Sequence, residues 1–314
     1  MADVLVLGAD GFIGSHLCES LVARGLTVRA FDRLPGGLAR NLVAHPDIEL
    51  FQGDFLNRHD LERALTGVRF VVHLVSTTTP ATSGTDPAFD VETNVRGSVE
   101  LFELCAKAGV ERVMFSSTGG AIYGRDIDRP LREADLPLPI SPYAIGKLAI
   151  EGYLRFYREA RNLDSIVLRI SNPYGERQPL EGAQGAVPIF LKRMLDGQPI
   201  TVFGDGSMVR DYIYVRDMTA MMASIIDQPA HHHLYNLASG TALSVLELLA
   251  ALEAASGISA LIEHAPDRPT DVHRVLLDTT RFHEDFGQRP MTPIADGLAH
   301  TYEYVRRKLE LTTT

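Results

Sequence analysis

The sequence predicts an α/β protein with a doubly wound parallel sheet and a second, smaller mixed α/β domain. Short apolar, β-branched runs alternate with helical patterns through the first half of its 314 residues, which is typical of a parallel sheet covered by helices. After about Ser171 this regularity is lost, and prolines and glycines indicate a loop-rich stretch. Right-handed crossovers between the early strands then build the doubly wound sheet.

The elements are expected in the following order. After the first strand, Ile13, Leu17 and Leu21 recur every four residues and form one apolar helix face. Further helices are expected around residues 89–108, 143–161, 245–256 and 294–309. Strands are expected at 4–7, 27–31, 48–51, 70–75, 113–116, 166–170, 200–203 and 212–215.

The charge balance is acidic, with 40 Asp and Glu against 30 Lys and Arg and a net charge of −10. Because there is no basic block, we do not expect a nucleic-acid partner. No apolar run approaches the ~20 residues of a membrane span, and the N-terminal residues lack the basic region of a signal peptide. Cys18 and Cys105 lie in helical patterns and are expected in the core of a protein in a reducing compartment. These features together predict a cytoplasmic protein.

A glycine-rich turn follows the first predicted strand and opens the first helix, with the sequence Gly-Ala-Asp-Gly-Phe-Ile-Gly at residues 8–14. Glycines at this place allow a sharp turn and a close approach to a pyrophosphate, whose charge lies at the helix N-terminus. Asp32 ends the second strand, where a carboxylate binds both ribose hydroxyls and repels a 2′-phosphate. The pattern predicts a Rossmann domain that prefers NAD to NADP.

Tyr143 and Lys147 stand four residues apart on a predicted helix and therefore share one face. A free tyrosine has a pKa of about 10 and is a poor base at neutral pH. A lysine cation and the positive nicotinamide ring stabilise the phenolate, so that proton exchange with a hydroxyl becomes feasible. Thr118 follows a predicted strand 25 residues upstream, where its hydroxyl can share the substrate oxygen with Tyr143.

In these motifs the chain resembles the extended short-chain dehydrogenase/reductase family, and within it the UDP-glucose (galactose) 4-epimerase group. The resemblance runs through nearly the whole chain. It includes the turn Asn-Pro-Tyr-Gly-Glu at 172–176, the segment from Gly204 to Val215 with its Arg-Asp-Tyr core, and Arg-Pro-Thr-Asp at 268–271. The joint order and spacing of these motifs are very specific.

The resemblance implies which residues form the site. It implies catalysis by Thr118, Tyr143 and Lys147, without a metal. NAD is implied as the cofactor, contacted by Gly8, Gly11, Phe12, Ile13, Gly14, Asp32, Asp54, Phe55, Leu74, Asn94, Ser116, Tyr143 and Lys147. A UDP-sugar is implied as the substrate, contacted by Thr118, Asn172, Val187, Thr201, Phe203, Arg210, Arg268, Asp271 and Val275.

The same residues suggest a division of the chain. We expect a NAD-binding Rossmann domain at residues 1–172, completed by a return segment at about 208–238, and a nucleotide-sugar-binding domain at 173–207 and 239–314. Arg210 and Arg268 bring guanidinium groups for a diphosphate into an otherwise acidic protein. The consecutive histidines at 231–233 cannot easily converge on one ion, so we do not expect them to bind a metal.

The resemblance implies epimerisation at C4 of the sugar through a 4-keto intermediate. Related 4,6-dehydratases carry Asp-Glu, and related UDP-glucuronate decarboxylases a Glu, where this chain has Gly119 and Gly120. This departure argues against both reactions. The alternatives are a nucleotide-sugar 4-ketoreductase or decarboxylase of the same family, and a non-catalytic NAD-binding sensor. The hydroxyl-rich segment at 76–79 either lines the sugar pocket or satisfies loop backbone.

Two further expectations concern assembly and substrate. Relatives dimerise through a four-helix bundle, whose counterparts here are the helices around 89–108 and 143–161. The second helix carries Leu148, Tyr153, Leu154 and Phe156, more apolar side chains than one core face needs, and predicts a homodimer. Val275 stands where relatives specific for glucose and galactose carry a tyrosine, so we expect room for an N-acetyl group. The sugar itself stays open between glucose, N-acetylhexosamine and hexuronate types.

Overall fold

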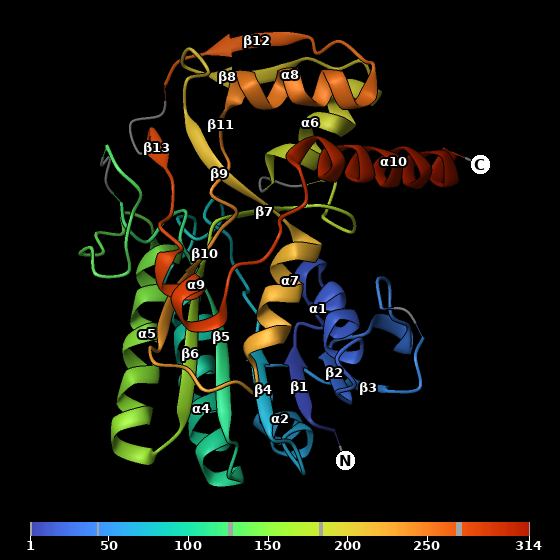
Figure 1. Cartoon of the computed structure of the whole chain (residues 1–314). Coiled ribbons are helices and arrows are strands. Elements are labelled where there is room, and N and C mark those ends of the chain that lie inside the picture. The colour runs from blue at the N-terminus through green and yellow to red at the C-terminus, as the bar shows by residue number, and fades with distance from the viewer. Residues whose placement is uncertain (1, 43, 125–127, 182–184, 268–271, 314) are drawn as a thin grey trace. The chain divides into compact units, whose positions relative to one another are not determined.

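The computed structural model describes residues 2–42, 44–124, 128–181, 185–267 and 272–313 (Figure 1). The chain divides into two compact units. Unit 1 comprises Met1–Ile122, Pro139–Arg169 and Thr219–Tyr235, and unit 2 comprises Tyr123–Leu138, Ile170–Met218 and Asn236–Thr314. The predicted domain boundaries, at residue 172 and at about 208 and 238, stay predictions.

Unit 1 is built on a sheet with the strand order β10-β6-β5-β4-β1-β2-β3. The strands are β1 (Val4–Leu7), β2 (Val28–Asp32), β3 (Ile48–Gln52), β4 (Phe70–His73), β5 (Arg112–Thr118), β6 (Asp164–Ile170) and β10 (Leu234–Leu237). β1 pairs in parallel with β2 and with β4, and the chain passes from edge strand β3 to β4 on the other side of β1. This reversal creates a crevice at the carboxyl ends of β1 and β4, where doubly wound proteins bind ligands. The predicted fold class is confirmed.

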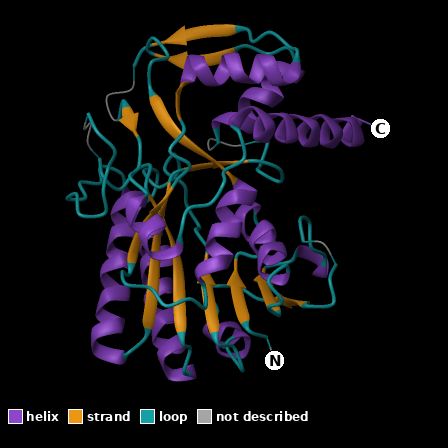
Figure 2. Cartoon of the chain, in the orientation of Figure 1, coloured by secondary structure: helices purple, strands orange, loops and turns teal. Residues whose placement is uncertain are grey.

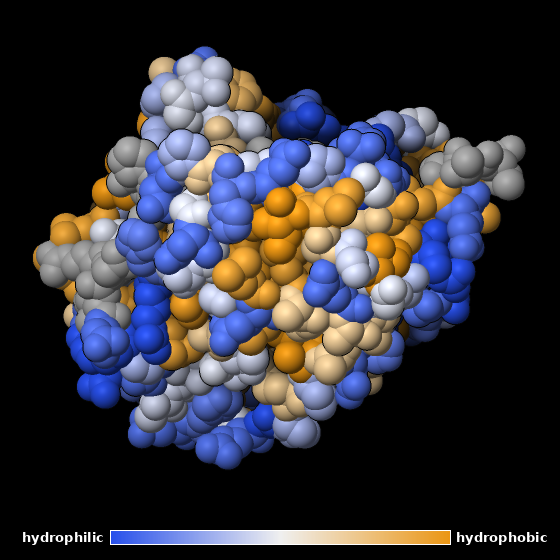
Figure 3. Space-filling view, turned by 90° about the horizontal axis from the view of Figure 1, so that it is seen from above, coloured by the Kyte–Doolittle hydropathy of each residue, from blue (hydrophilic) through white to orange (hydrophobic). Residues whose placement is uncertain are grey.

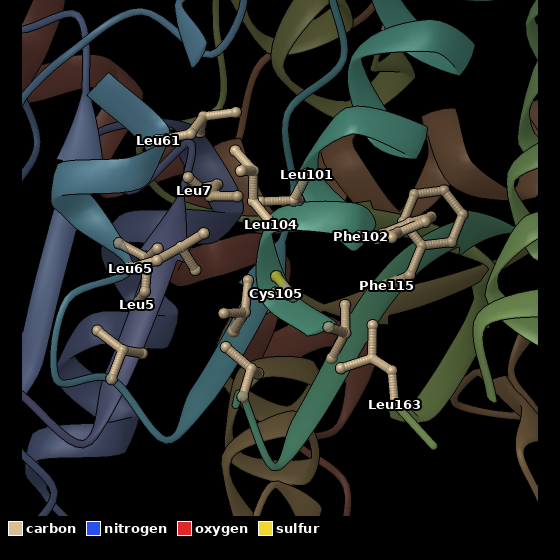
Figure 4. Packing of buried hydrophobic residues seen from close by; sticks show 14 of the residues in the cluster. Leu5, Leu7, Leu61, Leu65, Leu101, Phe102, Leu104, Cys105, Phe115 and Leu163 are labelled. Atoms are coloured by element: carbon tan, nitrogen blue, oxygen red, sulfur yellow. The ribbon is translucent and has the colours of Figure 1, made fainter. Parts of the chain in front are cut away.

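The helices of unit 1 cover this sheet (Figure 2). They are α1 (Phe12–Val22), α2 (Arg58–Ala64), α3 (Pro87–Asp90), the π-helix η2 (Val91–Arg96), α4 (Gly97–Ala108), α5 (Pro142–Arg161) and α7 (Val215–Ile225), which begins in unit 2; a 3-10 turn, η1, spans Pro35–Gly37. Figure 4 shows Leu5 and Leu7 of β1 packed with Leu61, Leu101 and Cys105 from α2 and α4. This buried layer fixes the helices to the strands that carry the site.

Unit 2 contains two small sheets. In the first, β9 (Val209–Tyr214) pairs with β7 (Asn172–Tyr174), β11 (Ala242–Ser244) and β13 (Arg274–Val275), and in the second β8 (Ile200–Phe203) pairs with β12 (Ile262–Ala265). The helices α6 (Ala186–Leu195), α8 (Val245–Ser256) and α10 (Ile294–Thr313) contact one another, and α9 spans Thr280–Phe286. Helix α8 begins with a capping box between Ser244 and Glu247, which satisfies two backbone N–H groups.

Local differences from the sequence prediction have simple causes. The helix expected at 89–108 is continuous but contains the π turn η2, which the apolar periodicity does not reveal. Helix α5 starts at Pro142, after the N-cap Ser141. Proline is favoured at the first helical position, because the N–H of that position has no partner inside the helix and its loss costs nothing. The strand expected at 212–215 starts earlier, at Val209, and ends at Tyr214, where α7 begins. The sequence prediction does not include α2, α6, α7 (Val215–Ile225), α9, β7 or β11–β13.

The surface of the described residues is mixed. Figure 3 shows hydrophilic and apolar side chains together on one face, as on most folded proteins. Within the described ranges, no helix has both the length and the apolar character needed to cross a bilayer. Cys18 and Cys105 are buried, as expected, and burial raises the pKa of the Cys105 thiol far above its usual value.

Candidate active site

The turn after β1 has the geometry of a pyrophosphate cradle. Gly8 has φ +83°, and a Cβ at Gly14 would lie 2.1 Å from the carbonyl oxygen of Gly8, so both positions need glycine. Gly11 is the N-cap of α1 and has no side chain to bond the first N–H groups. The N–H groups at the start of α1, near Phe12 and Ile13, are therefore available to an anion. This cradle fits a dinucleotide cofactor.

Asp32 lies at the end of β2, beside this turn. Its Oδ2 accepts the backbone N–H of Asp10 at 2.9 Å, and its Oδ1 accepts the N–H of Arg33 at 2.8 Å. Asp10 is buried, and its own carboxylate accepts backbone N–H groups from residues 40–42. The half-buried Asp32 carboxylate is thus held at the edge of the cradle. At this position it can accept hydrogen bonds from the ribose hydroxyls, as the sequence predicts.

Asp54 and Phe55 have separate tasks. Oδ1 of Asp54 accepts the N–H of Leu56 at 2.9 Å and closes a turn, whereas the cap of α2 is Asn57. Asp54 therefore does not cap α2. The Phe55 ring is buried and stacks on His73 at a centroid distance of 5.1 Å, so the ring belongs to the core. A cofactor contact at Phe55 has to come from its backbone.

Asn94 uses its side chain inside the protein. Its Oδ1 accepts the N–H of Thr77 at 2.8 Å, and its Nδ2 donates to Thr78 and to Asp90 at 3.0 Å each. Asn94 thereby holds the loop after β4, which starts at Leu74 with a backbone bond to Leu7. The structure places Asn94 as a support of this loop, and its predicted cofactor contact stays a prediction.

The hydroxyls of this loop are also used locally. Ser76 donates to the carbonyl of Thr78, Thr77 bonds Thr93 at 2.5 Å, and Thr79 bonds Thr82 at 3.1 Å. Of the two interpretations of the hydroxyl-rich segment, the structure favours loop support.

Tyr143 and Lys147 lie one turn apart at the start of α5, and Lys147 contacts β5. The Nζ of Lys147 donates to the carbonyl oxygen of Ser116 at 2.9 Å and lies 5.6 Å from the centre of the Tyr143 ring. Thr118 is the last residue of β5 and is half-buried. The N–H of Tyr143 donates to the buried hydroxyl of Ser83 at 3.1 Å, which anchors the start of the helix.

Burial changes the acidity of this pair. It lowers the pKa of Lys147 to about 8, although the negative charges of Asp90 and Glu151 act in the opposite direction. Burial also raises the pKa of Tyr143 to about 12, and Asp90 adds to this shift. At neutral pH the pair is therefore an ammonium beside a neutral phenol. Additional positive charge next to Tyr143 is needed before the phenol can act as a base.

Sequence reasoning missed Asp90, and it also missed Glu151 on α5 and Arg169 on β6. Glu151 forms a largely buried ion pair with Arg169 at 2.8 Å and accepts the Ser117 hydroxyl at 2.5 Å. This network joins α5 to β5 and β6. The signal for Asp90 was its spacing of four residues from Asn94 on one expected helix, which places both side chains on one face.

The expected substrate residues of unit 2 lie in different settings. Arg210 on β9 is in register with the buried Val275 on β13 and donates to the carbonyl of Val209 at 2.9 Å. Asn172 starts β7 and donates to the carbonyl of Asp211 at 3.0 Å. Val187 is buried in α6, whereas Thr201 and Phe203 lie on β8 with Thr201 exposed. Arg268 and Asp271 lie outside the described residues.

Within the described part of the chain, no group of three or more His, Cys, Asp and Glu side chains is placed to hold a metal ion. In the histidine run, the His233 ring bonds the carbonyl of Ser165 at 3.2 Å, and the His232 ring packs on Tyr235.

The chain that carries the glycine cradle, Asp32 and the Tyr143–Lys147 pair matches a known protein family. Residues 4–238 match the model of the NAD dependent epimerase/dehydratase family. The chain belongs to this family. The expected resemblance and the expected cofactor, NAD, are thereby confirmed, and the protein is an enzyme of the epimerase/dehydratase type.

Individual members of the family are similar over almost their full length. The UDP-glucose 4-epimerase of Mycolicibacterium smegmatis is 37% identical, with 97% of this chain and 98% of that protein covered. The crystal structure of Thermotoga maritima UDP-glucose 4-epimerase with UDP-glucose has a TM-score of 0.91 and 36% identity, covering 98% of this chain and 99% of the other. The Thermus thermophilus UDP-glucose 4-epimerase in complex with NAD has a TM-score of 0.88 and 36% identity, covering 97% and 99%.

Proposed function

We propose that this enzyme is a NAD-dependent 4-epimerase of a UDP-sugar and works through a transient 4-keto sugar. The observation that carries the proposal is the hydrogen bond from Lys147 to the carbonyl oxygen of Ser116 on β5, with Tyr143 one turn away on α5. Gly119 and Gly120 follow β5 directly. The pair can exchange a proton with a sugar hydroxyl. The two glycines offer no second acid for dehydration or decarboxylation.

The proposed roles follow from the geometry. Residues 8–14 bind the cofactor diphosphate at the start of α1, and Asp32 binds the adenosine ribose. When bound, NAD would supply the positive nicotinamide ring that can accept the C4 hydrogen as hydride and later return it. Tyr143 removes the proton from the C4 hydroxyl and returns it at the end, while Thr118 orients the C4 oxygen. Lys147 holds the cofactor ribose and stabilises the Tyr143 phenolate.

Inversion requires that the sugar turn over while its nucleotide stays bound. The site therefore has to bind the diphosphate tightly and the sugar weakly. Arg210 and Arg268 are proposed for the diphosphate, because guanidinium groups bind phosphate oxygens with two parallel hydrogen bonds. In this scheme residues 1–172 with the segment 208–238 bind NAD, and residues 173–207 and 239–314 bind the nucleotide sugar.

The assembly proposed is a homodimer. On α5, Ile145, Tyr153 and Phe156 are 52%, 43% and 52% exposed, and Tyr153 and Phe156 line an open apolar hollow with Ala149 and Gly152. Leu154 is only 1% exposed, so it belongs to the core and not to the apolar surplus expected from the sequence. Exposed aromatic side chains on a long helix are typical of a contact surface.

The experiment that tests the function uses the protein as purified. It is incubated with UDP-glucose, UDP-N-acetylglucosamine and UDP-glucuronate without added cofactor, and the configuration at C4 is followed by NMR. An epimerase reaches a mixture of two C4 isomers with no net redox change. A 4-ketoreductase gives no conversion without added reductant, and a sensor gives none at all. The Tyr143→Phe variant is the matched control for a contaminating epimerase.

A further inference from the structure

Asp90 is a buried carboxylate beside the Tyr143–Lys147 pair that the proposed chemistry does not use. It ends α3, is 0% exposed, and precedes the π turn η2. π-Helical turns occur mostly as single turns inside α-helices and are frequent at functional sites. A buried carboxylate costs free energy unless its oxygens are paired, so its retention here calls for a physical reason.

The two carboxylate oxygens of Asp90 have different surroundings. Oδ1 accepts hydrogen bonds from the Thr78 hydroxyl and from Nδ2 of Asn94, the latter at 3.0 Å. Oδ2 is buried and has no hydrogen-bond partner among the described residues. One oxygen is thus clamped by the loop after β4 and by η2, while the other makes no hydrogen bond within the described part of the chain.

The unpaired oxygen faces α5 at the residue just before Lys147. A Cβ at Gly146 would lie 2.9 Å from Oδ2 of Asp90, closer than a real Cβ contact allows. Gly146 is therefore the residue that lets the carboxylate approach the helix between Tyr143 and Lys147.

The other titratable groups at this place do not replace Asp90. Glu151, also on α5, is held in an ion pair with Arg169, and its charge acts on Lys147. His73 on β4 is buried, and burial together with the Lys147 charge lowers its pKa to about 3, so it is neutral in the working range. Among these groups, Asp90 is the one whose negative charge acts on both Tyr143 and Lys147.

We infer that Asp90 is a positioning residue for the Tyr143–Lys147 pair: its clamped carboxylate, pressed against α5 at Gly146, keeps the pair as an ammonium and a neutral phenol between turnovers. A phenol held neutral in this way releases its proton when positive charge is added beside it, which the oxidised cofactor provides. This role of Asp90 rests on the proposed acid–base role of Tyr143. Asp90 determines when Tyr143 can release its proton.

The test measures the ionisation of Tyr143 directly. Protein labelled with ¹³C at Cζ of tyrosine is titrated by NMR, and the Tyr143 signal is assigned with Tyr143→Phe. In Asp90→Asn the Tyr143 signal should begin to titrate at a pH lower by about one unit or more than in wild type, because a nearby negative charge is lost. Asp90→Ser, which also removes the charge, has the same expectation and serves if Asp90→Asn does not fold.

The controls separate charge from structure. Asp86→Asn makes the same chemical change at the exposed N-cap of α3 and should leave the Tyr143 titration as in wild type. Asp90→Glu retains the charge and should restore the wild-type onset. Equal Tyr143 titrations in wild type, Asp90→Asn and Asp90→Ser would overturn the inference.

Activity gives a second readout. If the protein epimerises a UDP-sugar, both limbs of the pH profile of kcat should move to lower pH in Asp90→Asn, since Tyr143 and Lys147 each lose a negative neighbour. A purely structural role would lower kcat without moving the limbs and would contradict the inference. Because the NMR titration needs no substrate, a shifted Tyr143 without any epimerisation would reject the proposed function and retain the role of Asp90.

Discussion

The backbone N–H of Asp10 donates to Oδ2 of Asp32 at 2.9 Å, which ties the carboxylate at the end of β2 to the glycine turn after β1. The carboxylate is therefore already in place before a cofactor binds. Preorganised groups of this kind lose little conformational freedom on binding.

The first prediction concerns cofactor selection. Purified protein should carry NAD(H), found by denaturing extraction and chromatography. Asp32→Asn keeps an oxygen for the Asp10 N–H but removes the charge, so the ratio of NADP to NAD bound should rise by at least about tenfold, or ~1.4 kcal/mol. Asp54→Asn, a like change just after strand β3, is the control and should leave the ratio unchanged. Recovery of mostly NADP from wild type would contradict the role of Asp32.

The second prediction concerns catalysis. Tyr143→Phe removes the proposed proton-exchanging hydroxyl and should lower kcat by at least about 100-fold. Thr118→Val should have a smaller effect, because it removes orientation and one hydrogen bond. Rates are compared by single-time-point NMR under saturating substrate, and circular dichroism checks the fold. Near-normal turnover by Tyr143→Phe would exclude the mechanism.

The third prediction concerns Gly146. Alanine in a helix interior is usually more stable than glycine by about 0.5–1 kcal/mol. At position 146 the added Cβ meets Oδ2 of Asp90, so Gly146→Ala should instead destabilise the protein by about 1–3 kcal/mol in urea unfolding. In an Asp90→Ala background the same change should be neutral or stabilising. A stabilising Gly146→Ala in the wild-type background would show that the contact is absent.

The fourth prediction concerns assembly. Light scattering at micromolar concentration should give a dimer. Phe156→Arg places a charge on the exposed apolar face of α5 and should shift the protein toward monomer, whereas Leu261→Arg, at a side chain 56% exposed in unit 2, should not. A monomer in wild type would reject the proposed interface.

The fifth prediction concerns substrate range. Val275 is 2% exposed and is in register with Arg210, so a tyrosine there has to fill space next to the proposed diphosphate ligand. Val275→Tyr should lower turnover of UDP-N-acetylhexosamines by about one to two orders of magnitude, the equivalent of ~1–3 kcal/mol of overpacking. UDP-glucose turnover should stay nearly unchanged, which also controls for folding. Wild type that converts UDP-glucose but not UDP-N-acetylglucosamine would contradict the prediction.

The features that sequence determined by itself are local. The order of the main strands and helices of the central sheet follows from apolar periodicity. The cradle at residues 8–14 follows from its glycines, because the contacts that require glycine at Gly14 are made within the same turn, to Gly8. The Tyr143–Lys147 spacing places both side chains on one helix face whatever surrounds them. Such features depend on residues close in sequence, so periodicity and spacing are sufficient to predict them.

The features that only tertiary structure decided are contacts between distant segments. Asp90 meets Gly146 across 56 positions of sequence, and Ser117 meets Glu151 across 34. Likewise, Leu154 faces the core while Tyr153 beside it is exposed, which the apolar pattern of α5 left open. Charge compensation and burial depend on which elements pack together. A carboxylate enclosed by three segments differs greatly in free energy from the same carboxylate in water, although the local sequence is the same.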